Sequence, residues 1–174
     1  MRTFFVLAWI FILLSTGCLA VAQSHGEKLS AKVAFEGESK LEGTVNGQRV
    51  RIILTTYKID IGTPSQTPPQ EHDNNCTYSR FPCSQVKSLR IWVNGARLRV
   101  PKSSYLDCAD IGTMTIEAES KDLVLQMIGG DASEGYSVKI AFDTHRVEKR
   151  SVYWTEGNDR LLETTTYMPP VVVN

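Results

Sequence analysis

The chain has 174 residues, with 19 Lys+Arg against 19 Asp+Glu and a hydrophobic fraction of 42%. A formal charge of zero argues against a nucleic-acid-binding protein, because such a protein needs a net basic face that releases the counterions of the phosphates. The hydrophobic fraction is ordinary for a globular protein, and the length suits a single domain that buries its own core.

The first 22 residues have the parts of a secretory signal peptide. Arg2 carries the positive charge, residues 4–14 form an apolar run too short to span a bilayer, and residues 20–22 match the small-x-small pattern at which signal peptidase cuts. We therefore expect an exported protein, periplasmic or secreted, that begins at Gln23; the alternative is a retained N-terminal anchor. No second apolar run of spanning length follows, so no transmembrane segment is expected in the mature chain.

A lipid anchor is the alternative form of export. Ser15, Thr16 and Gly17 precede Cys18 at the end of the apolar run, and a small residue before a cysteine is the pattern at which bacterial lipoproteins are cut and lipidated. Ser15 stands where such sites usually carry leucine, which favours the signal peptide. A lipid on Cys18 would tether the protein to a membrane without changing its fold.

The chain has four cysteines, of which Cys76, Cys83 and Cys108 remain after the leader. In an oxidising compartment pairing is the default, and three cysteines allow one bridge. We favour a disulfide between Cys76 and Cys83, which bracket the short segment CTYSRFPC, and keep Cys83–Cys108 as the alternative. In the favoured scheme Cys108 is a small buried hydrophobic residue.

The first half of the mature chain predicts strands and a hairpin. KVAFEG and LEGTV are short strand candidates, and RIILTTYKIDI over residues 51–61 is rich in β-branched and aromatic residues. The Asn-Gly pair of VNGQRV lies between two strand-like runs and predicts a tight turn. A long loop rich in Pro, Ser and Thr follows over residues 62–83, and it is either functional or a solvated crossover between sheets.

A second hairpin is predicted in LRIWVNGARLRV, around Asn94 and Gly95. The segment KSSYLDCADIG has no clean alternation and predicts one helical turn, with Ser103 or Ser104 as its N-cap.

The remaining chain predicts strands separated by polar turns: TMTIEAE, LVLQMI, residues 136–142, RVEKRSVYWT and LLETTTY, followed by a loose tail over residues 168–174. In residues 136–142 apolar and polar side chains alternate, as in an antiparallel strand with one buried face. No segment has helical periodicity. About eight to ten strands predict an all-β fold, an antiparallel β-sandwich or a small barrel, in a single β-rich domain over residues 23–174.

Residues 129–135 (GGDASEG) can be a calcium loop or the corner of a hairpin. Asp131 and Glu134 supply two carboxylates, but the alternating spacing of a calcium loop is missing. A corner explains the same residues, because glycine accepts a positive φ and Asp or Ser bonds to nearby backbone in turns. We favour the corner.

Catalytic and metal-binding motifs are absent from the sequence. The histidines are His25, His72 and His145, with no close pair that would hold a catalytic zinc ion. His72 could join Cys76 and Cys83 in a metal site, but the disulfide competes for both sulfurs. No nucleophile elbow or phosphate-binding loop occurs. No catalytic, metal-binding or cofactor-binding residue is therefore predicted, and no cofactor.

Cys108 is a poor candidate nucleophile, since Asp107 and Asp110 disfavour its thiolate. The charges of residues 148–150 and of Arg97 and Arg99 are expected on outward strand faces, as solvated surface and not as an anion site. Four aromatic residues could offer a binding face, although such residues more often fill the core: Trp92, Tyr153, Trp154 and Tyr167.

Three segments, CTYSRFPC, VNGARLRVPKSSYLD and IGGDASEGYSVKIAFDTHRVEKR, together resemble small exported bacterial β-rich proteins without an assigned function. The resemblance covers residues 76–167. It implies a bacterial exported domain and brings no activity, cofactor or catalytic residue.

These features favour an exported, non-catalytic β domain that binds a macromolecular partner in the cell envelope, a protein or a glycan. Contacts with the partner are expected at Tyr78 and Arg80 of the disulfide loop and at Gly129, Gly130 and Asp131 of the corner. The alternatives are an envelope enzyme with an unrecognised site and a small-ligand carrier whose strands close into a barrel.

Overall fold

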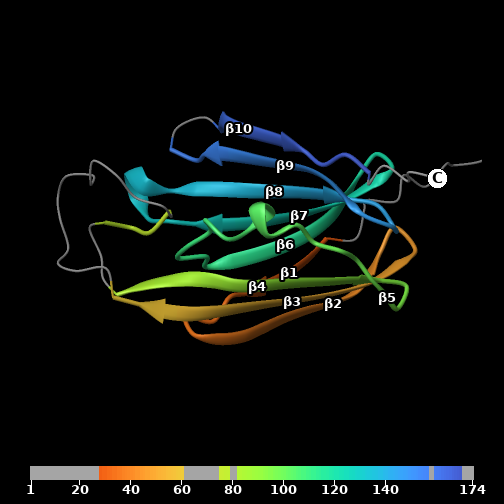
Figure 1. Ribbon diagram of the computed structural model, residues 1–174, viewed down its shortest axis with the longest axis horizontal. Coiled ribbons are helices and arrows are strands. Elements are labelled where there is room, and N and C mark those ends of the chain that lie inside the picture. Colours follow the sequence, from red (N-terminus) through yellow and green to blue (C-terminus); the bar gives the residue numbers. More distant parts are fainter. Residues whose placement is uncertain (1–27, 61–74, 79–81, 157–158, 170–174) are drawn as a thin grey trace, which may run out of the picture.

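A computed structural model describes residues 28–60, 75–78, 82–156 and 159–169 of the chain (Figure 1). The predicted leader, most of the loop over residues 62–83 and most of the tail lie outside these residues. The described chain forms two antiparallel sheets that are not closed into a barrel, so the all-β prediction is confirmed as a β-sandwich and the barrel alternative is wrong.

The larger sheet has six strands in the order β1-β6-β7-β8-β9-β10. Their bounds are Leu29–Lys32 for β1, Thr113–Glu119 for β6, Asp122–Gly129 for β7, Tyr136–Phe142 for β8, Val147–Trp154 for β9 and Arg160–Thr166 for β10. The smaller sheet has the order β2-β3-β4-β5, with β2 at Gly37–Val45, β3 at Gln48–Ile59, β4 at Cys83–Val93 and β5 at Ala96–Arg97. The described residues also contain two short 3-10 turns, η1 at Lys102–Ser104 and η2 at Ala132–Glu134.

Both predicted Asn-Gly hairpins are confirmed. Asn46 and Gly47 join β2 to β3, and Asn94 and Gly95 join β4 to β5; all four residues have a positive φ, between 49° and 86°. Asparagine and glycine tolerate this conformation, which matches the twist of the flanking strands. The two turns also lie next to each other, since the backbone N–H of Arg49 donates to Oδ1 of Asn94 at 3.0 Å.

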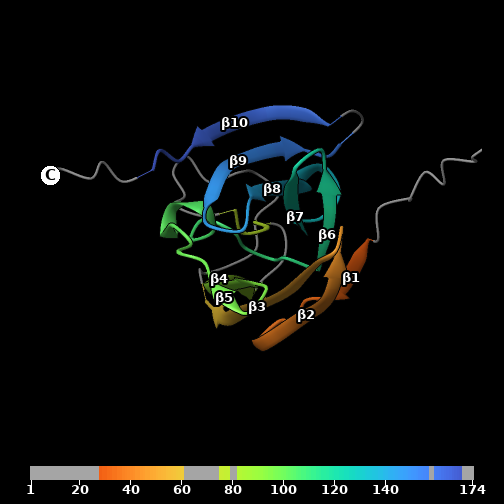
Figure 2. The ribbon, with the colours of Figure 1, turned by 90° about the vertical axis from the view of Figure 1, so that its right-hand side faces the viewer.

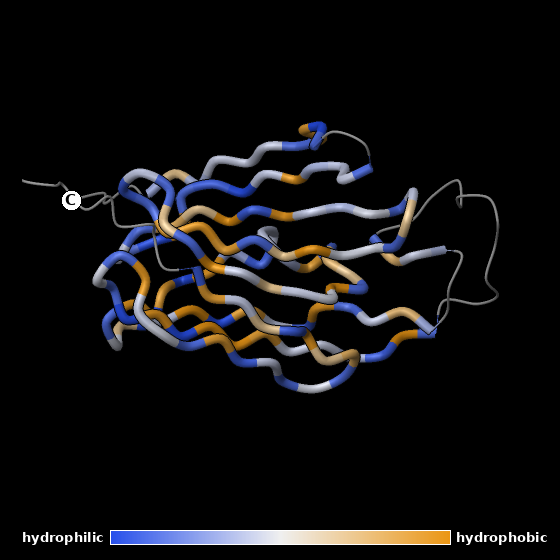
Figure 3. The backbone as a smooth tube through the Cα atoms, turned by 180° about the vertical axis from the view of Figure 1, so that it is seen from behind, coloured by the Kyte–Doolittle hydropathy of each residue, from blue (hydrophilic) through white to orange (hydrophobic). Residues whose placement is uncertain are grey.

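The core lies between the two sheets, where alternate residues of most strands turn inward, β5 and β10 excepted. Figure 3 shows apolar residues along the strands of both sheets, whereas β10 is mostly polar. Each fully buried aliphatic or aromatic side chain contributes roughly 1.5–3 kcal/mol relative to an exposed one. The largest fully buried apolar side chains are Ile52, Leu54, Ile91, Met114, Ile116, Leu125, Met127, Ile140 and Phe142.

The predicted strand KVAFEG is wrong in its bounds, since β1 ends at Lys32 and residues 33–36 belong to no strand. Here the chain crosses from the larger sheet to the smaller one. Side chains make the backbone hydrogen bonds that strand pairing would otherwise provide. The N–H of Ala34 donates to Oγ of Ser39 at 2.7 Å, and Oγ1 of Thr56 donates to the carbonyl of Ala34 at 2.8 Å. Hydroxyl groups thus serve as hydrogen-bond partners for the backbone N–H and carbonyl groups at the crossover.

A helical turn is present in the predicted segment as η1, but it lies earlier than predicted, since η1 ends at Ser104 and the predicted turn begins after Ser103 or Ser104. Pro101 occupies the N-cap position, and Oγ of Ser104 donates back to the carbonyl of Pro101 at 2.7 Å inside the turn. Pro101 has extended backbone geometry, and its side chain makes no capping hydrogen bond, so the turn starts without a side-chain cap.

The segment between β5 and β6 runs between the smaller sheet and strands β8 and β9 (Figure 2). The hydroxyl of Tyr136 on β8 donates to the carbonyl of Ala109 at 2.6 Å and accepts from the N–H of Ala109 at 2.7 Å. On the other side, the N–H of Val86 on β4 donates to the carbonyl of Cys108 at 2.9 Å. The segment therefore connects the two sheets.

Candidate functional site

The predicted disulfide between Cys76 and Cys83 is present and ties the described segment 75–78 to the start of β4. The buried carboxylate of Asp110 holds both sides of this connection. Its Oδ2 accepts from the N–H of Thr77 and its Oδ1 from the N–H of Ser84, each at 2.9 Å. Segment 75–78 is thus fixed against the body of the sandwich.

Arg150 corrects the expectation of a solvated charge. The alternation of β9 places it on the inner face, opposite Ile140, and only 2% of its side chain is exposed. Its guanidinium donates to Asp107 and, at 2.8 Å, to Oε1 of Glu163 on β10. Burial opposes the positive charge, but the neighbouring carboxylates, Asp107 first, raise the pKa of Arg150. This network joins β9, β10 and the segment before β6.

Cys108 is free and buried, as the favoured disulfide scheme predicts. Burial, with a smaller effect of the neighbouring Asp107 carboxylate, raises the pKa of its thiol to about 12. The thiol is therefore protonated at neutral pH and unsuited to nucleophilic chemistry.

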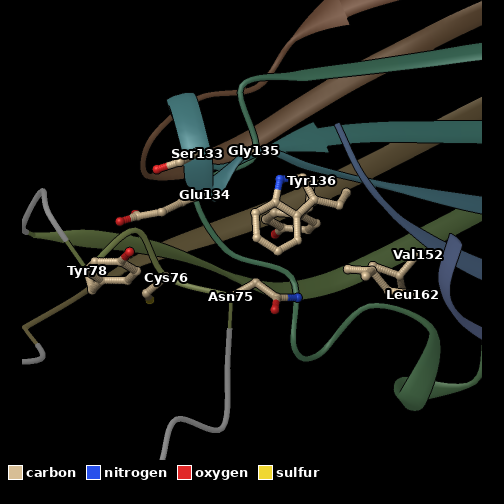
Figure 4. Close-up of a pocket in the computed structure, with 10 residues that line it drawn as sticks. Asn75, Cys76, Tyr78, Ser133, Glu134, Gly135, Tyr136, Val152 and Leu162 are labelled. Atoms are coloured by element: carbon tan, nitrogen blue, oxygen red, sulfur yellow. The ribbon is translucent and has the colours of Figure 1, made fainter. Parts of the chain in front are cut away.

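A half-open pocket lies beside the disulfide, where segment 75–78, η2 and the ends of β8, β9 and β10 converge (Figure 4). Its cavity volume is about 280 Å³. Its lining residues are Asn75, Cys76, Tyr78, Ser133, Glu134, Gly135, Tyr136, Val152, Trp154 and Leu162. Residues far apart in the sequence are brought together because β8, β9 and β10 are consecutive neighbours in one sheet.

Apolar and aromatic side chains line the part of the pocket formed by the sheet. Tyr136 and Trp154 are direct neighbours across β8 and β9, and the hydroxyl of Tyr136 is bound to Ala109, which fixes its ring. Trp154 and Leu162 keep 36% and 50% of their surface exposed. The guanidinium of Arg160 lies 5.4 Å from the centroid of the Trp154 ring and steadies it by a cation–π contact.

Polar groups lie on the opposite side of the pocket. Figure 4 shows the carboxylate of Glu134 reaching toward the hydroxyl of Tyr78. Desolvation and the adjacent Glu134 carboxylate raise the pKa of Tyr78, so the phenol stays protonated at neutral pH. Oε2 of Glu134 is shielded from solvent and has no hydrogen-bond partner among the residues that the structure describes. This oxygen is therefore an unused hydrogen-bond acceptor at the edge of the pocket.

The Gly-Gly-Asp segment forms a corner between β7 and β8, and Gly130 is the residue that makes the corner tight. Its φ is +76°, and a Cβ at this position would lie 2.1 Å from the carbonyl oxygen of Glu134. A side chain here would displace η2, and with it Glu134.

The predicted contact residues fall in different surroundings. Tyr78 lines the pocket, Asp131 is exposed beside it, Gly130 is half-buried, and Gly129 is buried against the ring of Tyr136. Arg80 lies outside the described residues.

Sequence reasoning did not assign Asn75 or Leu162 to a binding site, considered Glu134 only for the calcium loop that it rejected, and weighed Trp154 mainly as a core residue. The alternation of β9, which places Trp154 on the same face as Val152 at the end of the strand, was a usable signal for Trp154.

In the described ranges no group of three or more His, Cys, Asp or Glu residues could hold a metal ion, and His72 lies outside them. No helix in the same ranges is long and apolar enough to cross a bilayer. Comparison of the chain with protein-family models, curated proteins and solved structures finds no match in any of the three.

Proposed function

We propose that the protein is an exported, non-catalytic binding domain that recognises a protein partner in the cell envelope through the pocket beside the Cys76–Cys83 disulfide. The signal-peptide pattern of the first 22 residues supports export, and a disulfide is compatible with an oxidising compartment. The observation that carries the proposal is the pocket itself, with aromatic and aliphatic faces on one side and polar groups on the other.

This composition is typical of a recognition site. Ligand-binding sites are concave and largely apolar, with a few polar groups that fix orientation. Tyr and Trp are the residue types enriched in contacts that dominate binding energy, and Tyr78, Tyr136 and Trp154 all line this pocket. Their apolar surfaces supply contact area, while Glu134 and the Tyr78 hydroxyl supply specificity.

The walls of the pocket are held in place before a partner arrives. The disulfide and Asp110 fix segment 75–78, and the two hydrogen bonds to Ala109 fix Tyr136. Ordering flexible side chains and loops on association opposes binding, so a preformed pocket binds more tightly than a mobile one.

The pocket suits an apolar stem that ends in a hydrogen-bond donor. The stem would pack against Trp154 and Leu162, and the donor would reach the unpartnered Oε2 of Glu134. A lysine or arginine side chain has this form, since its methylene chain is apolar and its tip is cationic. We therefore expect the partner to insert a basic side chain.

Tryptophan fluorescence tests the pocket directly. The mature chain that begins at Gln23 has two tryptophans, so a Trp92→Phe background leaves Trp154 as the single reporter. Titration with N-acetyl-arginine amide should change this signal with a dissociation constant in the millimolar range, as expected for about 4 kcal/mol. Glu134→Gln should weaken the response about tenfold, because a charge-assisted hydrogen bond is lost. An equal response in both proteins would contradict the role of Glu134.

The partner itself is tested by capture from envelope extract with the wild type, Trp154→Ala and the control Phe35→Ala. Phe35 is 48% exposed and is not a lining residue, so its removal takes away surface apolar area elsewhere. A partner recovered by the wild type and the control but not by Trp154→Ala supports the proposal. Recovery of the partner by all three proteins, or recovery of no protein by the wild type, refutes it.

A further inference from the structure

A second hollow on the surface, the basic groove, has a different chemistry. It lies along β4 and β5 and the chain that follows them, and its volume is about 390 Å³. Four of its lining side chains are cationic and none is acidic: Arg90, Arg97, Arg99 and Lys102. It shares no lining residue with the pocket beside the disulfide.

Most of this positive charge has no internal compensation. Arg97, Arg99 and Lys102 form no ion pair with any residue in the described ranges, and only Arg90 pairs, with Glu38 of β2. Nε of Arg90 is shielded from solvent and has no acceptor among the same residues. In a chain with equal numbers of basic and acidic residues, such a cluster concentrates positive potential in one hollow.

The cations are positioned by the hairpin and by an aromatic ring. Guanidinium carbons of Arg51 and Arg97 lie 5.2 Å and 5.7 Å from the centroid of Trp92. Each contact favours the stacked arrangement of guanidinium and ring. The N–H of Leu98 donates to the carbonyl of Ile91 at 2.9 Å, and Arg99 forms a parallel bridge with Arg146. The backbone that carries the cations is therefore fixed.

The spacing of the arginines suits repeated anionic groups. Leu98 is buried, so Arg97 and Arg99 project from the opposite, exposed side of the chain. Residues two apart in extended chain are separated by about 6.6 Å. Guanidinium groups bind carboxylate and phosphate in two-point geometry, so neighbouring arginines can hold successive anions of one chain.

We propose that the basic groove binds an acidic polysaccharide, with Arg97, Arg99 and Lys102 meeting its carboxylate or phosphate groups and Arg90 completing the site from β4. The groove volume suits one or two charged sugars and not a nucleic-acid duplex, for which a net basic protein would also be expected. A bilayer of anionic lipids is flat and would meet a protruding surface better than a hollow.

The test is calorimetric titration of the purified protein with polygalacturonate, a carboxylated polysaccharide, and with inorganic phosphate as a competitor. We expect saturable binding that weakens as sodium chloride rises from about 0.05 to 0.5 M, because salt screens exposed charges. Arg97→Glu/Arg99→Glu should weaken binding at least about a hundredfold, since each lost charged contact is worth about tenfold. Arg97→Lys/Arg99→Lys keeps the charge and should weaken it about tenfold or less.

The matched control is Lys121→Glu/Lys149→Glu, which makes the same change of charge at two exposed lysines outside the groove. It should bind like the wild type, and circular dichroism of every variant confirms the strand content. Absence of binding to polygalacturonate, or equal losses in the control, overturns the proposal. Tighter binding to single-stranded DNA or to phosphatidylglycerol vesicles than to the polysaccharide also overturns it. Since Trp154 and Glu134 are untouched, their response to N-acetyl-arginine amide is expected to persist in all these variants.

Discussion

The buried charge network of Arg150 gives the sharpest test of how this fold is held together. The perturbations are Asp107→Asn and Glu163→Gln, which replace each carboxylate by an amide of the same shape. Only 2% of the Arg150 side chain is exposed, against 36% for Asp107 and 53% for Glu163. Water therefore screens the pair of Arg150 with Glu163 more strongly than the pair of Arg150 with Asp107.

The magnitudes follow from these exposures. Removing one partner of a fully buried pair costs about 3–5 kcal/mol, because the remaining charge is left uncompensated. Asp107 is partly hydrated, so we expect about 2–3 kcal/mol for Asp107→Asn. Glu163 is half exposed, and Glu163→Gln should cost about 1 kcal/mol or less. Arg150→Met should cost less than Asp107→Asn, because it leaves two carboxylates that water can reach and removes an Nε without a described partner.

The assay is equilibrium unfolding in urea at neutral pH, followed by tryptophan fluorescence with the disulfide intact. The free energies of unfolding of two variants can be compared only where their dependence on urea concentration has the same slope. A changed slope reports a different exposure of surface on unfolding. A loss for Glu163→Gln equal to that for Asp107→Asn would refute the reasoning. So would a loss for Arg150→Met larger than that for Asp107→Asn.

Three further outcomes are expected. Replacing both Cys76 and Cys83 by Ala should lower the free energy of unfolding by about 2 kcal/mol, the value for a short loop in the chain-entropy view, and an unchanged urea midpoint would contradict this. Cys108 should resist iodoacetamide at neutral pH until the protein is unfolded, because its thiol is buried and its pKa is about 12; rapid labelling of the native protein, read by mass spectrometry, would show otherwise. Gly130→Ala should destabilise by about 2 kcal/mol or more in thermal unfolding, since it combines a positive φ with a close contact, whereas Gly112→Ala has open space and should be near neutral.

Local chemistry in the sequence was sufficient to predict the strands and turns. Asn46-Gly47 and Asn94-Gly95 specify tight turns through their own backbone preferences, and the alternation of residues 136–142 specifies a strand with an inner face. The Cys76–Cys83 disulfide was predictable because the loop that it closes is short and the two cysteines lie close together in the sequence. These features depend on neighbours in the chain.

The features that could not be predicted depend on partners far away in the chain. Arg150 looks like a solvated charge next to Lys149, and only the pairing with Asp107 and Glu163 permits its burial. The pocket likewise needs the order of β8, β9 and β10, which places Leu162 near Trp154, and the disulfide, which brings Asn75 to them. The choice between sandwich and barrel depends on how the sheet edges meet, which strand periodicity does not encode.

The position of β10 has a consequence for motion. This strand is at the edge of the six-stranded sheet, and nearly all its residues are exposed. Apart from the backbone hydrogen bonds with β9, the main polar contact that holds it is the hydrogen bond from Arg150 to Glu163. Amide hydrogens of β10 should consequently exchange with solvent long before those of β7 and β8, in a local opening that leaves the interior intact. Each such opening moves Leu162 away from Trp154. The lifetime of a partner bound in the pocket therefore depends on how often β10 separates from β9.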